Sequence, residues 1–472
     1  LTGDCSVLQP LHYRNKAIIF YTHHASIATY IRITLLKLII IIALVFMEFK
    51  QAYGQNLVET YQLALSNNPT LNKAYFEKFT AAESRSQSIA KMLPTISVTG
   101  KSAKERLDNS RRGNVQGTGV QNYYDHSLMI DFKQPVFHLD HWIQLSQSDN
   151  KIAQAEANYL AEQQNLMAKT TEAYFNVLSA QDELASVLAE KKAVQRQLDA
   201  VQQRYAIGLV ALTDVHNAQA EIDQLNANEI DKENKLYEAK EELIKIAGGN
   251  NINLNPIAKE LLFTPPVPED ITAWNEAAEN NNYSIVAALN EAEASRKSID
   301  IQQSGHLPQL DIIANYAVKD SNSRAGFQGD TQSIGLELNI PIFEGGAVNS
   351  RTREAQYKFN IAQEKTIEAR RKVNQEVNNS YRGVVSNLHR VGALKKTITS
   401  IENAVATTEA GFQAGILTMA DVLTEQRKLY RTSREYSRSR YDYLINGIKL
   451  KSAGGSLTED DLEQVNSLLE KH

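Results

Sequence analysis

The residues best placed to do chemistry are few, and most are acidic or imidazole side chains beside predicted breaks in the chain. His138 and His141 stand three positions apart, and Asp214 and Asp421 each follow a glycine-containing break. A P-loop, an HExxH metalloprotease motif and a cysteine pair are all missing from the sequence. We therefore predict a protein that is not an enzyme and that needs no cofactor.

The histidine pair has two interpretations. His138 and His141 could be drawn as two ligands of one metal ion. They also occupy the strand-to-helix corner that Gly345 and Gly346 fill in the second half of the chain. We favour the structural role, and we expect no structural metal site.

Charge and composition narrow the class of protein. The 472 residues carry 50 Lys and Arg against 55 Asp and Glu, a net charge of −5. Nucleic-acid binders usually show a basic surplus, so we expect no nucleic-acid partner. Few prolines and a region rich in Ala, Gln, Glu and Leu from about residue 143 favour long helices.

An export signal is predicted near the N-terminus. Arg32 and Lys37 precede the apolar run 38–46, and the small residues Ala52 and Gly54 follow it. A basic flank, a short apolar run and small residues at alternate positions are what signal peptidase recognises. Cleavage after Gly54 would make 1–54 an upstream segment that is removed; an uncleaved anchor is the alternative.

The chain repeats itself, and the repeat predicts its organisation. We expect an upstream segment, two structural repeats separated by a proline-rich connector, and a C-terminal segment: 1–54, 55–262, 263–270, 271–454 and 455–472. The recurring landmarks are an Asn-Asn pair, a Leu-Pro pair, a Pro-x-Phe motif and an aromatic-x-x-Gly break: 67–68 with 281–282, 93–94 with 307–308, 135–137 with 341–343, and 205–208 with 412–415.

Each repeat is predicted to hold two strands and two long helices. Apolar and polar residues alternate along the strand segments, so one face of each is apolar. The first long helix lacks Pro and Gly over about 60 residues, a rod of roughly 90 Å, and Val187, Val194 and Val201 recur at coiled-coil spacing. The predicted strands are 95–103, 127–136, 309–319 and 332–342; the predicted helices are 143–205, 213–247, 346–411 and 418–451.

Four amphipathic strands suggest a shared membrane barrel. They have about the length that crosses a bilayer, but four strands cannot close a barrel and open edges in lipid are forbidden. Several subunits would then have to share one barrel, with Asp131, Lys133, Asp311, Glu337 and Asn339 facing its water-filled interior. A soluble or periplasmic coiled-coil scaffold without a pore, and an enzyme carried on helical repeats, are the alternatives.

The sequence resembles the TolC family of outer-membrane factors over nearly its whole length from about residue 55. The most specific motifs are QLDAVQQRYAIGLVALTDVHNA, GHLP, PIFEGGAVNS and YDYLIN, at 197–218, 305–308, 341–350 and 441–446. The resemblance implies a mainly α fold with a β-barrel portion: a homotrimer in which each subunit adds four strands to one transmembrane β-barrel and long coiled-coil helices form a periplasmic α-barrel.

The resemblance also implies a role and partners. Members of the family sit in the bacterial outer membrane, in contact with its lipid, with a large periplasmic portion. They serve as passive exit ducts in tripartite multidrug efflux and in type I protein secretion. They work with a periplasmic adaptor protein and, through it, with an inner-membrane transporter of the RND, ABC or MFS class.

The family's constriction lies on the helix after the second turn, as two aspartates one helical turn apart. Asp421 matches the first of these positions, and Thr424 stands at the second. Three copies of Asp421 would form an acidic ring that favours cations and could bind divalent ions. Thr424 makes this ring weaker than is usual in the family, and Glu425 points elsewhere on the helix. Helix capping near Thr418 is the alternative role of Asp421.

The family also holds its closed state with polar links between the repeats. Asp214, after Thr213, matches one partner, but Phe412 stands where the aromatic hydroxyl would be and Leu417 where the arginine would be. We therefore expect the closed state to be held differently here.

The apolar turns themselves are candidate adaptor-docking contacts, and packing between tips is the alternative. The docking candidates are Gly208, Leu209, Val210, Gly415 and Ile416.

Overall fold

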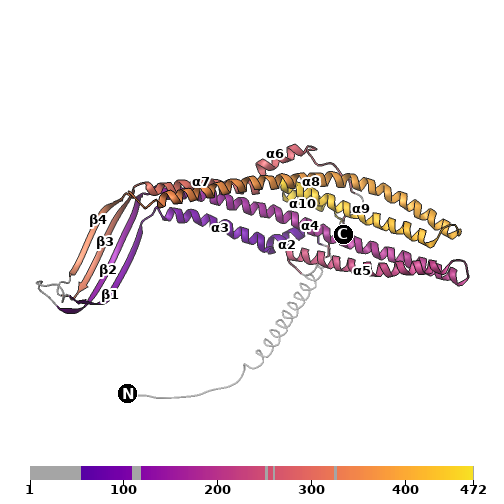
Figure 1. Cartoon of the computed structure of the whole chain (residues 1–472), viewed down its shortest axis with the longest axis horizontal. Helices are drawn as coiled ribbons and strands as arrows, with labels where there is room; N and C mark the ends of the chain where they lie inside the picture. Colours follow the sequence, from indigo (N-terminus) through magenta and orange to yellow (C-terminus); the bar gives the residue numbers. More distant parts are fainter. Residues whose placement is uncertain (1–54, 109–118, 250–252, 259–260, 324–326, 471–472) are drawn as a thin grey trace, which may run out of the picture.

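The structure is a computed structural model that describes residues 55–108, 119–249, 253–258, 261–323 and 327–470. Helices form the long axis of the molecule, with a four-stranded sheet at one end and two helix–turn–helix tips at the other (Figure 1). The predicted signal in 1–54, and residues 109–118 between the first two predicted strands, lie outside the described residues. Within the described parts, no helix is both long enough and apolar enough to cross a bilayer.

Two copies of one arrangement follow each other along the chain: two short helices, two strands and two long helices. The first copy comprises α2 (Leu57–Asn67), α3 (Pro69–Ala90), β1 (Thr95–Asp108), β2 (Val120–Phe137), α4 (Leu139–Ala206) and α5 (Leu212–Ala247). The second comprises α6 (Ile271–Asn281), α7 (Tyr283–Gln303), the 3-10 turn η1 (Ser304–His306), β3 (Gln309–Ser321), β4 (Gln328–Asn339), α8 (Ala347–Gln413) and α9 (Met419–Ala453). The short helix α10 (Glu459–Asn466) follows them.

The recurring Asn-Asn pair has a physical reason. The side-chain oxygen of Asn68 accepts the backbone N–H of Leu71 and caps α3, while its amide nitrogen donates to the carbonyl of Ile246 near the end of α5. Asn282 caps α7 in the same way and donates to the carbonyl of Ala453 at the end of α9. In each repeat, one asparagine therefore accepts a free N–H at the start of one helix and donates to a carbonyl near the end of another.

The sheet is antiparallel throughout, in the order β1-β2-β3-β4. Its register aligns apolar side chains across all four strands in a row of Ile96, Phe132, Ala314 and Ile334. The next row, of Ser97, Asp131, Asn315 and Ser333, is polar. Successive residues of a strand point to opposite faces, so one face of the sheet is apolar and the other is polar, as the alternation predicts.

The strand ends differ from those predicted. β1 continues to Asp108 and β2 already begins at Val120, so both strands are longer than expected. β4 spans Gln328–Asn339 and stops short of the predicted end at 342. Pro341 has no backbone N–H to donate, so the chain leaves the ladder there and turns into the corner before α8.

The long helices pack through valines spaced by seven. Val187, Val194 and Val201 on α4 are buried, and so are Val377, Val384 and Val391 on α8. This spacing keeps one stripe of each helix against its neighbour, as in a coiled coil. A central core, to which α2, α4, α5, α9 and α10 all contribute, holds the middle of the molecule.

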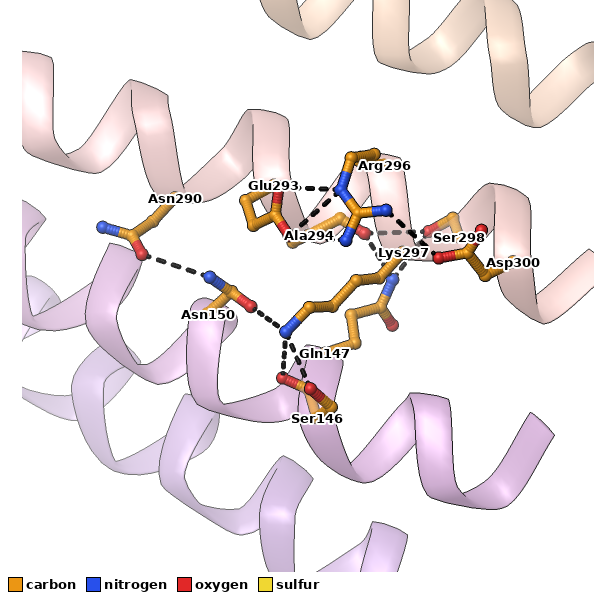
Figure 2. Close-up of polar contacts among 10 residues, drawn as sticks. All are labelled: Ser146, Gln147, Asn150, Asn290, Glu293, Ala294, Arg296, Lys297, Ser298 and Asp300. Carbon is orange, nitrogen blue, oxygen red and sulfur yellow. Dashed lines mark hydrogen bonds and ion pairs between the residues drawn. The ribbon is translucent and has the colours of Figure 1, made fainter. Parts of the chain in front are cut away.

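Near the sheet, a polar layer joins the two repeats through α4 and α7 (Figure 2). The Lys297 ammonium donates to the carbonyl and hydroxyl of Ser146 and to the side-chain oxygen of Asn150, at 2.7–3.0 Å. The buried amide of Gln147 donates to the Ala294 carbonyl at 2.7 Å. These bonds fix the relative register of α4 and α7, because a slip of either helix would leave buried polar groups without partners.

Candidate functional site at the helix tips

The two turns at the far end of the helices share one backbone device. Gly208 and Gly415 both lie in the left-handed region, with φ of +78° and +76°. The next residue in each turn donates its N–H five residues back, from Leu209 to Arg204 and from Ile416 to Gly411, at 2.9 Å. This is the Schellman ending of a helix, in which glycine adopts the left-handed conformation at little cost.

The apolar core of the tip is shared between the repeats. Val194, Leu198 and Val201 of α4 pack with Ala218, Ile222 and Leu225 of α5. Met419, Val422 and Leu423 at the start of α9 complete the cluster from the second repeat. The first turn of α9 is therefore held against the α4–α5 hairpin by buried apolar area.

Asp214 reaches across the repeats toward the start of α9. Its carboxylate accepts the backbone N–H of Met419 at 3.4 Å. A carboxylate beside the N-terminus of a helix is favoured both by the free N–H groups and by the helix dipole. Neither Phe412 nor Leu417 replaces the family's usual partners of this aspartate; Leu417 instead packs over Gly411.

Phe412 takes part in a different contact. The guanidinium of Arg204 on α4 lies 5.2 Å from the centre of the Phe412 ring on α8. This is a cation–π geometry, which needs no hydroxyl on the aromatic ring. The loss of the hydroxyl is therefore matched by an arginine that lies on the first repeat rather than at position 417.

A carboxylate and two amides add a polar bridge beside this contact. The Glu409 carboxylate on α8 accepts from Gln426 on α9 at 2.9 Å and from Gln197 on α4 at 3.4 Å. One acid on the second repeat thus connects three helices. Gln197, Glu409 and Gln426 were not singled out from sequence, because isolated Gln and Glu residues on long helices carry no distinctive pattern.

Ionic contacts continue this connection away from the tip. Arg427 on α9 lies 3.3 Å from Glu221 on α5, and Arg434 lies 2.7 Å from Glu190 on α4. Glu190 is only 2 % exposed, and burial raises the pKa of its carboxyl above the ordinary value, although the hydrogen bond from Arg434 opposes this shift. We call four contacts the tip links: Arg204–Phe412, Gln197–Glu409, Asp214–Met419 and Glu221–Arg427.

Asp421 forms a capping box at the start of α9. One of its carboxylate oxygens accepts the N–H of Thr418 at 2.9 Å and the hydroxyl of Thr418 at 2.7 Å. These hydrogen bonds lower the pKa of Asp421 below its usual range, so the exposed side chain carries a negative charge at neutral pH. The capping role weighed from sequence is therefore present, and it leaves the carboxylate ionised at the surface.

The neighbours of Asp421 fit the weak ring that the sequence predicts. Thr424 is exposed one turn later and donates its hydroxyl to the Ala420 carbonyl at 2.7 Å. Glu425 is paired with Lys428 at 2.5 Å, and its carboxylate is largely covered. Asp421 is thus the acid that remains exposed on this face of the first turns of α9. Thr213 is also exposed, at the start of α5.

The apolar turns differ in how far they project. Leu209 is 70 % exposed and Ile416 is 79 % exposed, so both extend from the tip. Val210, also predicted as a docking contact, is half-buried and packs against the tip core. Gly208 and Gly415 shape the turns beneath these side chains.

Comparison with known proteins decides the class of the molecule. The family model described as outer membrane efflux protein matches residues 60–249 and 274–456. The chain belongs to the outer membrane efflux protein family. The two matched segments cover most of the two copies seen in the fold.

Two curated relatives and one solved structure illustrate the likeness. The outer membrane protein TolC of Escherichia coli is 34 % identical over 430 residues, which cover 89 % of this chain and 86 % of that protein. The alkaline protease secretion protein AprF of Pseudomonas aeruginosa is 24 % identical and covers 88 % of each chain. The CmeC outer membrane channel of Campylobacter jejuni superposes with a TM-score of 0.76 at 13 % identity, over 88 % of this chain and 90 % of that one.

Membership of the outer membrane efflux protein family fixes location and role. The chain is an outer-membrane exit duct with a helical portion and a strand portion, and its family is one of channels rather than enzymes. The coiled-coil scaffold without a pore, kept open from sequence, is thereby set aside.

Proposed function

We propose that the chain is one subunit of a homotrimeric outer-membrane duct whose helical end is closed by the tip links. The duct would serve tripartite drug efflux or type I protein secretion with a periplasmic adaptor and an inner-membrane RND, ABC or MFS transporter. The observation that carries this proposal is that the sheet has two free edges while the helix tips of the two repeats are joined. One end of the subunit needs further copies, and the other end is already held together.

The free edges call for neighbouring copies. Among the described residues, β1 and β4 each pair with one strand of the sheet, and unpaired backbone groups are not tolerated in lipid. Pairing β4 of one copy with β1 of the next satisfies both edges. Three copies then supply about twelve strands, enough to close a barrel.

The two helical flanks of the subunit also suit contact with neighbouring copies, because each exposes large apolar side chains. α3 lies at one flank and exposes Phe76 and Phe79, and α8 lies at the other and exposes Tyr357 and Ile361. Phe76 is 66 % exposed and Tyr357 is 65 % exposed. Large apolar side chains that gather in an exposed patch mark a surface that binds another protein. A shallow groove on α8 runs along Tyr357, Ile361 and Ile367.

Counting residues from the sheet places these two surfaces at the same height. Phe79 and Phe76 precede the end of α3 by 11 and 14 residues, and Ile361 follows the start of α8 by 14. At a rise of about 1.5 Å per residue, the aromatic side chains of one copy meet the α8 groove of the next. The same head-to-tail step, repeated three times, closes a ring.

The proposed gate lies at the tips. The tip links connect the α8–α9 hairpin to the α4–α5 hairpin, so separating the two hairpins would widen the opening between three copies. Asp421 would line this opening as a ring of three carboxylates. Leu209 and Ile416 would provide the apolar contacts for an adaptor. The alternative is that the tips of neighbouring copies pack against each other and cover these side chains.

The direct test is to purify the chain without its upstream segment and measure its mass in detergent and its conductance in planar lipid bilayers. A trimer that gives discrete, small current steps supports the proposal. A stable monomer in water with no conductance would contradict it. To separate efflux from secretion, a deletion strain should be tested both for drug sensitivity and for secreted proteins missing from the medium.

A further inference from the structure

A compact group of imidazole and carboxylate side chains lies far from the tips, where β2 turns into α4. His138 precedes the first residue of α4, and Asp140 and His141 lie in its first turn. All three side chains are largely buried, with His138 only 10 % exposed. The proposed gate plays no part in this corner.

The three residues bring possible metal ligands close together. The Nδ1 atom of His138 lies 3.9 Å from one carboxylate oxygen of Asp140, and the Nε2 atom of His141 lies 3.6 Å from the other. One ligand atom from each of the three residues lies within 4.8 Å of the others. Ligand atoms around a tetrahedral zinc ion are roughly 3.3 Å apart, given bonds of about 2.0–2.1 Å. Small side-chain rotations would therefore bring the group to that spacing.

A second carboxylate orients the first histidine. The Nε2 atom of His138 lies 3.0 Å from Asp311 on β3, and Lys133 on β2 holds the same carboxylate at 2.9 Å. Asp311 is 4 % exposed. A carboxylate that accepts one ring N–H of a histidine leaves the other nitrogen free for a metal ion and raises its basicity. Here the free nitrogen is the Nδ1 atom that faces Asp140.

The other histidine has an unsatisfied atom. The Nδ1 atom of His141 is buried and has no hydrogen-bond partner. A buried polar atom without a partner costs free energy, and a native structure usually compensates for it. A metal ion bound at Nε2 would leave Nδ1 protonated and still unpaired, whereas a rotated ring that binds the ion through Nδ1 would give this atom a partner.

The second repeat shows that the corner itself does not need histidines. There the chain passes from β4 to α8 through Gly345 and Gly346, both with positive φ. Glycine alone suffices to make that turn. The first repeat makes the equivalent turn with an extended residue, His138, which gives α4 no side-chain cap. The two histidines are thus an addition to the corner rather than a requirement of it.

We propose that His138, Asp140 and His141 bind one transition-metal ion per chain, of the class of Zn²⁺ or Co²⁺, with Asp311 as the orienting partner of His138. Two imidazoles and a carboxylate are a ligand set that such ions favour. The bound ion would join His138, the residue that follows β2, to the first turn of α4. It would stiffen the junction between the sheet and the helices in all three copies.

The stacking of the His138 and His141 rings shows which side chains must rotate to bind an ion. The two imidazole rings are stacked, with centroids 4.6 Å apart and planes 13° apart. The in-plane lone pairs of parallel rings do not converge on one point, so at least one ring must rotate when an ion binds. The stack thereby gives a spectroscopic signature, because both histidine ring resonances should shift on binding.

The test is a zinc titration of the detergent-purified trimer, prepared without a histidine tag. An Asp421→Asn background removes ions held at the tips. We expect saturable binding of one Zn²⁺ per chain and a higher thermal midpoint, and we expect Co²⁺ to give the visible absorption of a low-coordinate nitrogen–oxygen site. In this background, His141→Gln should weaken binding by at least a hundredfold. Asp311→Asn should weaken it by about 10–100-fold.

The control variant is His306→Gln, which removes a histidine at the corresponding end of the second repeat. Its ring contacts the exposed side chain of Asn349 and lies outside the group. It should bind Zn²⁺ as the parent does. The thermal midpoint of His141→Gln measured without zinc shows whether this variant is folded. Absence of stoichiometric binding in the parent, or equal binding by His141→Gln and the parent, would overturn the proposal.

Discussion

The α4–α5 and α8–α9 hairpins have the same turn, but their side chains are buried to very different extents. In the first repeat, α4 is buried against its neighbours up to Val201, five residues before it ends. In the second repeat, α8 contributes no buried side chain beyond Val391, although the structure describes the helix through to Gln413. The last 22 residues of α8 are therefore kept in place by the tip links and by α9 rather than by a core.

The opposite end of the molecule provides the contrast. There β2 pairs with β3, and the polar layer around Lys297 and Gln147 joins α4 to α7. The repeats are thus joined at the sheet by strand pairing and the polar layer, whereas at the tips only the start of α9 shares an apolar core with the first repeat and the end of α8 relies on the tip links. Regions with few buried apolar contacts open at the lowest free-energy cost. We therefore propose that the outer end of α8 is the part of the α8–α9 hairpin that moves most readily.

The largest effect should come from breaking the proposed contact between neighbouring subunits. Ile361→Asp places a charge in the α8 groove that is proposed to receive the α3 aromatics of the next copy. We expect loss of the trimer and of all conductance, measured by mass in detergent and by bilayer recording. Ile230→Asp on α5, at a side chain with similar exposure, is the matched control and should remain trimeric. A conducting trimer of Ile361→Asp would refute the proposed flank.

Removal of Arg434, the partner of the buried Glu190, should destabilise the fold. Arg434→Met leaves the Glu190 carboxylate without its 2.7 Å partner. Breaking one side of a buried pair costs about 3–5 kcal/mol, and thermal unfolding of the trimer should show a lower midpoint. The double variant Glu190→Gln with Arg434→Met should recover most of the loss. If both variants unfold alike, the pair is not the source of the stability.

The same carboxyl gives a prediction about pH. Burial raises the pKa of Glu190, so the folded state binds more protons than the unfolded state between the ordinary glutamate value and the raised one. Stability conferred at this position must therefore fall as pH rises through that window. Relative to the parent, Glu190→Gln should gain thermal stability as pH increases above about 4.5. A difference that does not change with pH would show that the carboxyl does not titrate differently on unfolding.

Breaking the tip links should open the channel while the trimer persists. Arg427→Glu sets a like charge against Glu221, and Arg204→Ala removes the cation over Phe412. Each contact contributes roughly 1 kcal/mol or less, so the two changes together should raise the open fraction by about tenfold. The charge swap Glu221→Arg with Arg427→Glu should return to parental conductance. An Arg204→Ala/Arg427→Glu variant as closed as the parent would argue against gating by these contacts.

Loss of the aspartate ring should change ion block more than opening. Asp421→Asn keeps a side-chain oxygen for the Thr418 cap but removes the charge. We expect block by divalent cations to need several-fold higher concentrations, as measured from single-channel currents. Glu425→Gln, at an acid already paired with Lys428, is the control and should behave as the parent does. Unchanged block in Asp421→Asn would reject the ring.

The smallest effect should come from a glycine at the boundary of the buried stripe. Gly392 follows Val391, the last buried residue of α8, and space for a methyl group is open around it. Gly392→Ala should stabilise the helix by up to about 1 kcal/mol and reduce bending at this point. We expect a slightly lower open fraction. A higher open fraction would show that the arm does not bend there.

Much of the fold could be predicted from sequence because its signals are periodic. The heptad valines, the alternating strands and the duplicated landmarks each follow a fixed spacing that the backbone imposes. The resemblance to a family supplied the barrel and the location. Strand ends were less predictable, since β1 continues through Lys104, Glu105 and Arg106, polar residues that carry no alternation.

The tip was only partly predictable. The glycine turns, Asp214 and Asp421 follow from turn chemistry and helix starts. Gln197 and Glu409 lie 212 positions apart, and Glu409 and Gln426 lie 17 apart across a turn, and local sequence gives no sign of either pair. The partner of Phe412 was equally hidden, because an arginine on a long helix has no feature that marks it as lying over an aromatic ring.

The most direct measurement is to lock α4 to α8 at the tip. Gln197→Cys with Glu409→Cys, in a Cys5→Ser background, would be joined by a short bis-maleimide in the Arg427→Glu channel. We expect cross-linking to return this opened channel to the small parental conductance, while each single-cysteine variant treated in the same way stays open. Full conductance with the cross-link in place would show that the duct opens without separating the two hairpins.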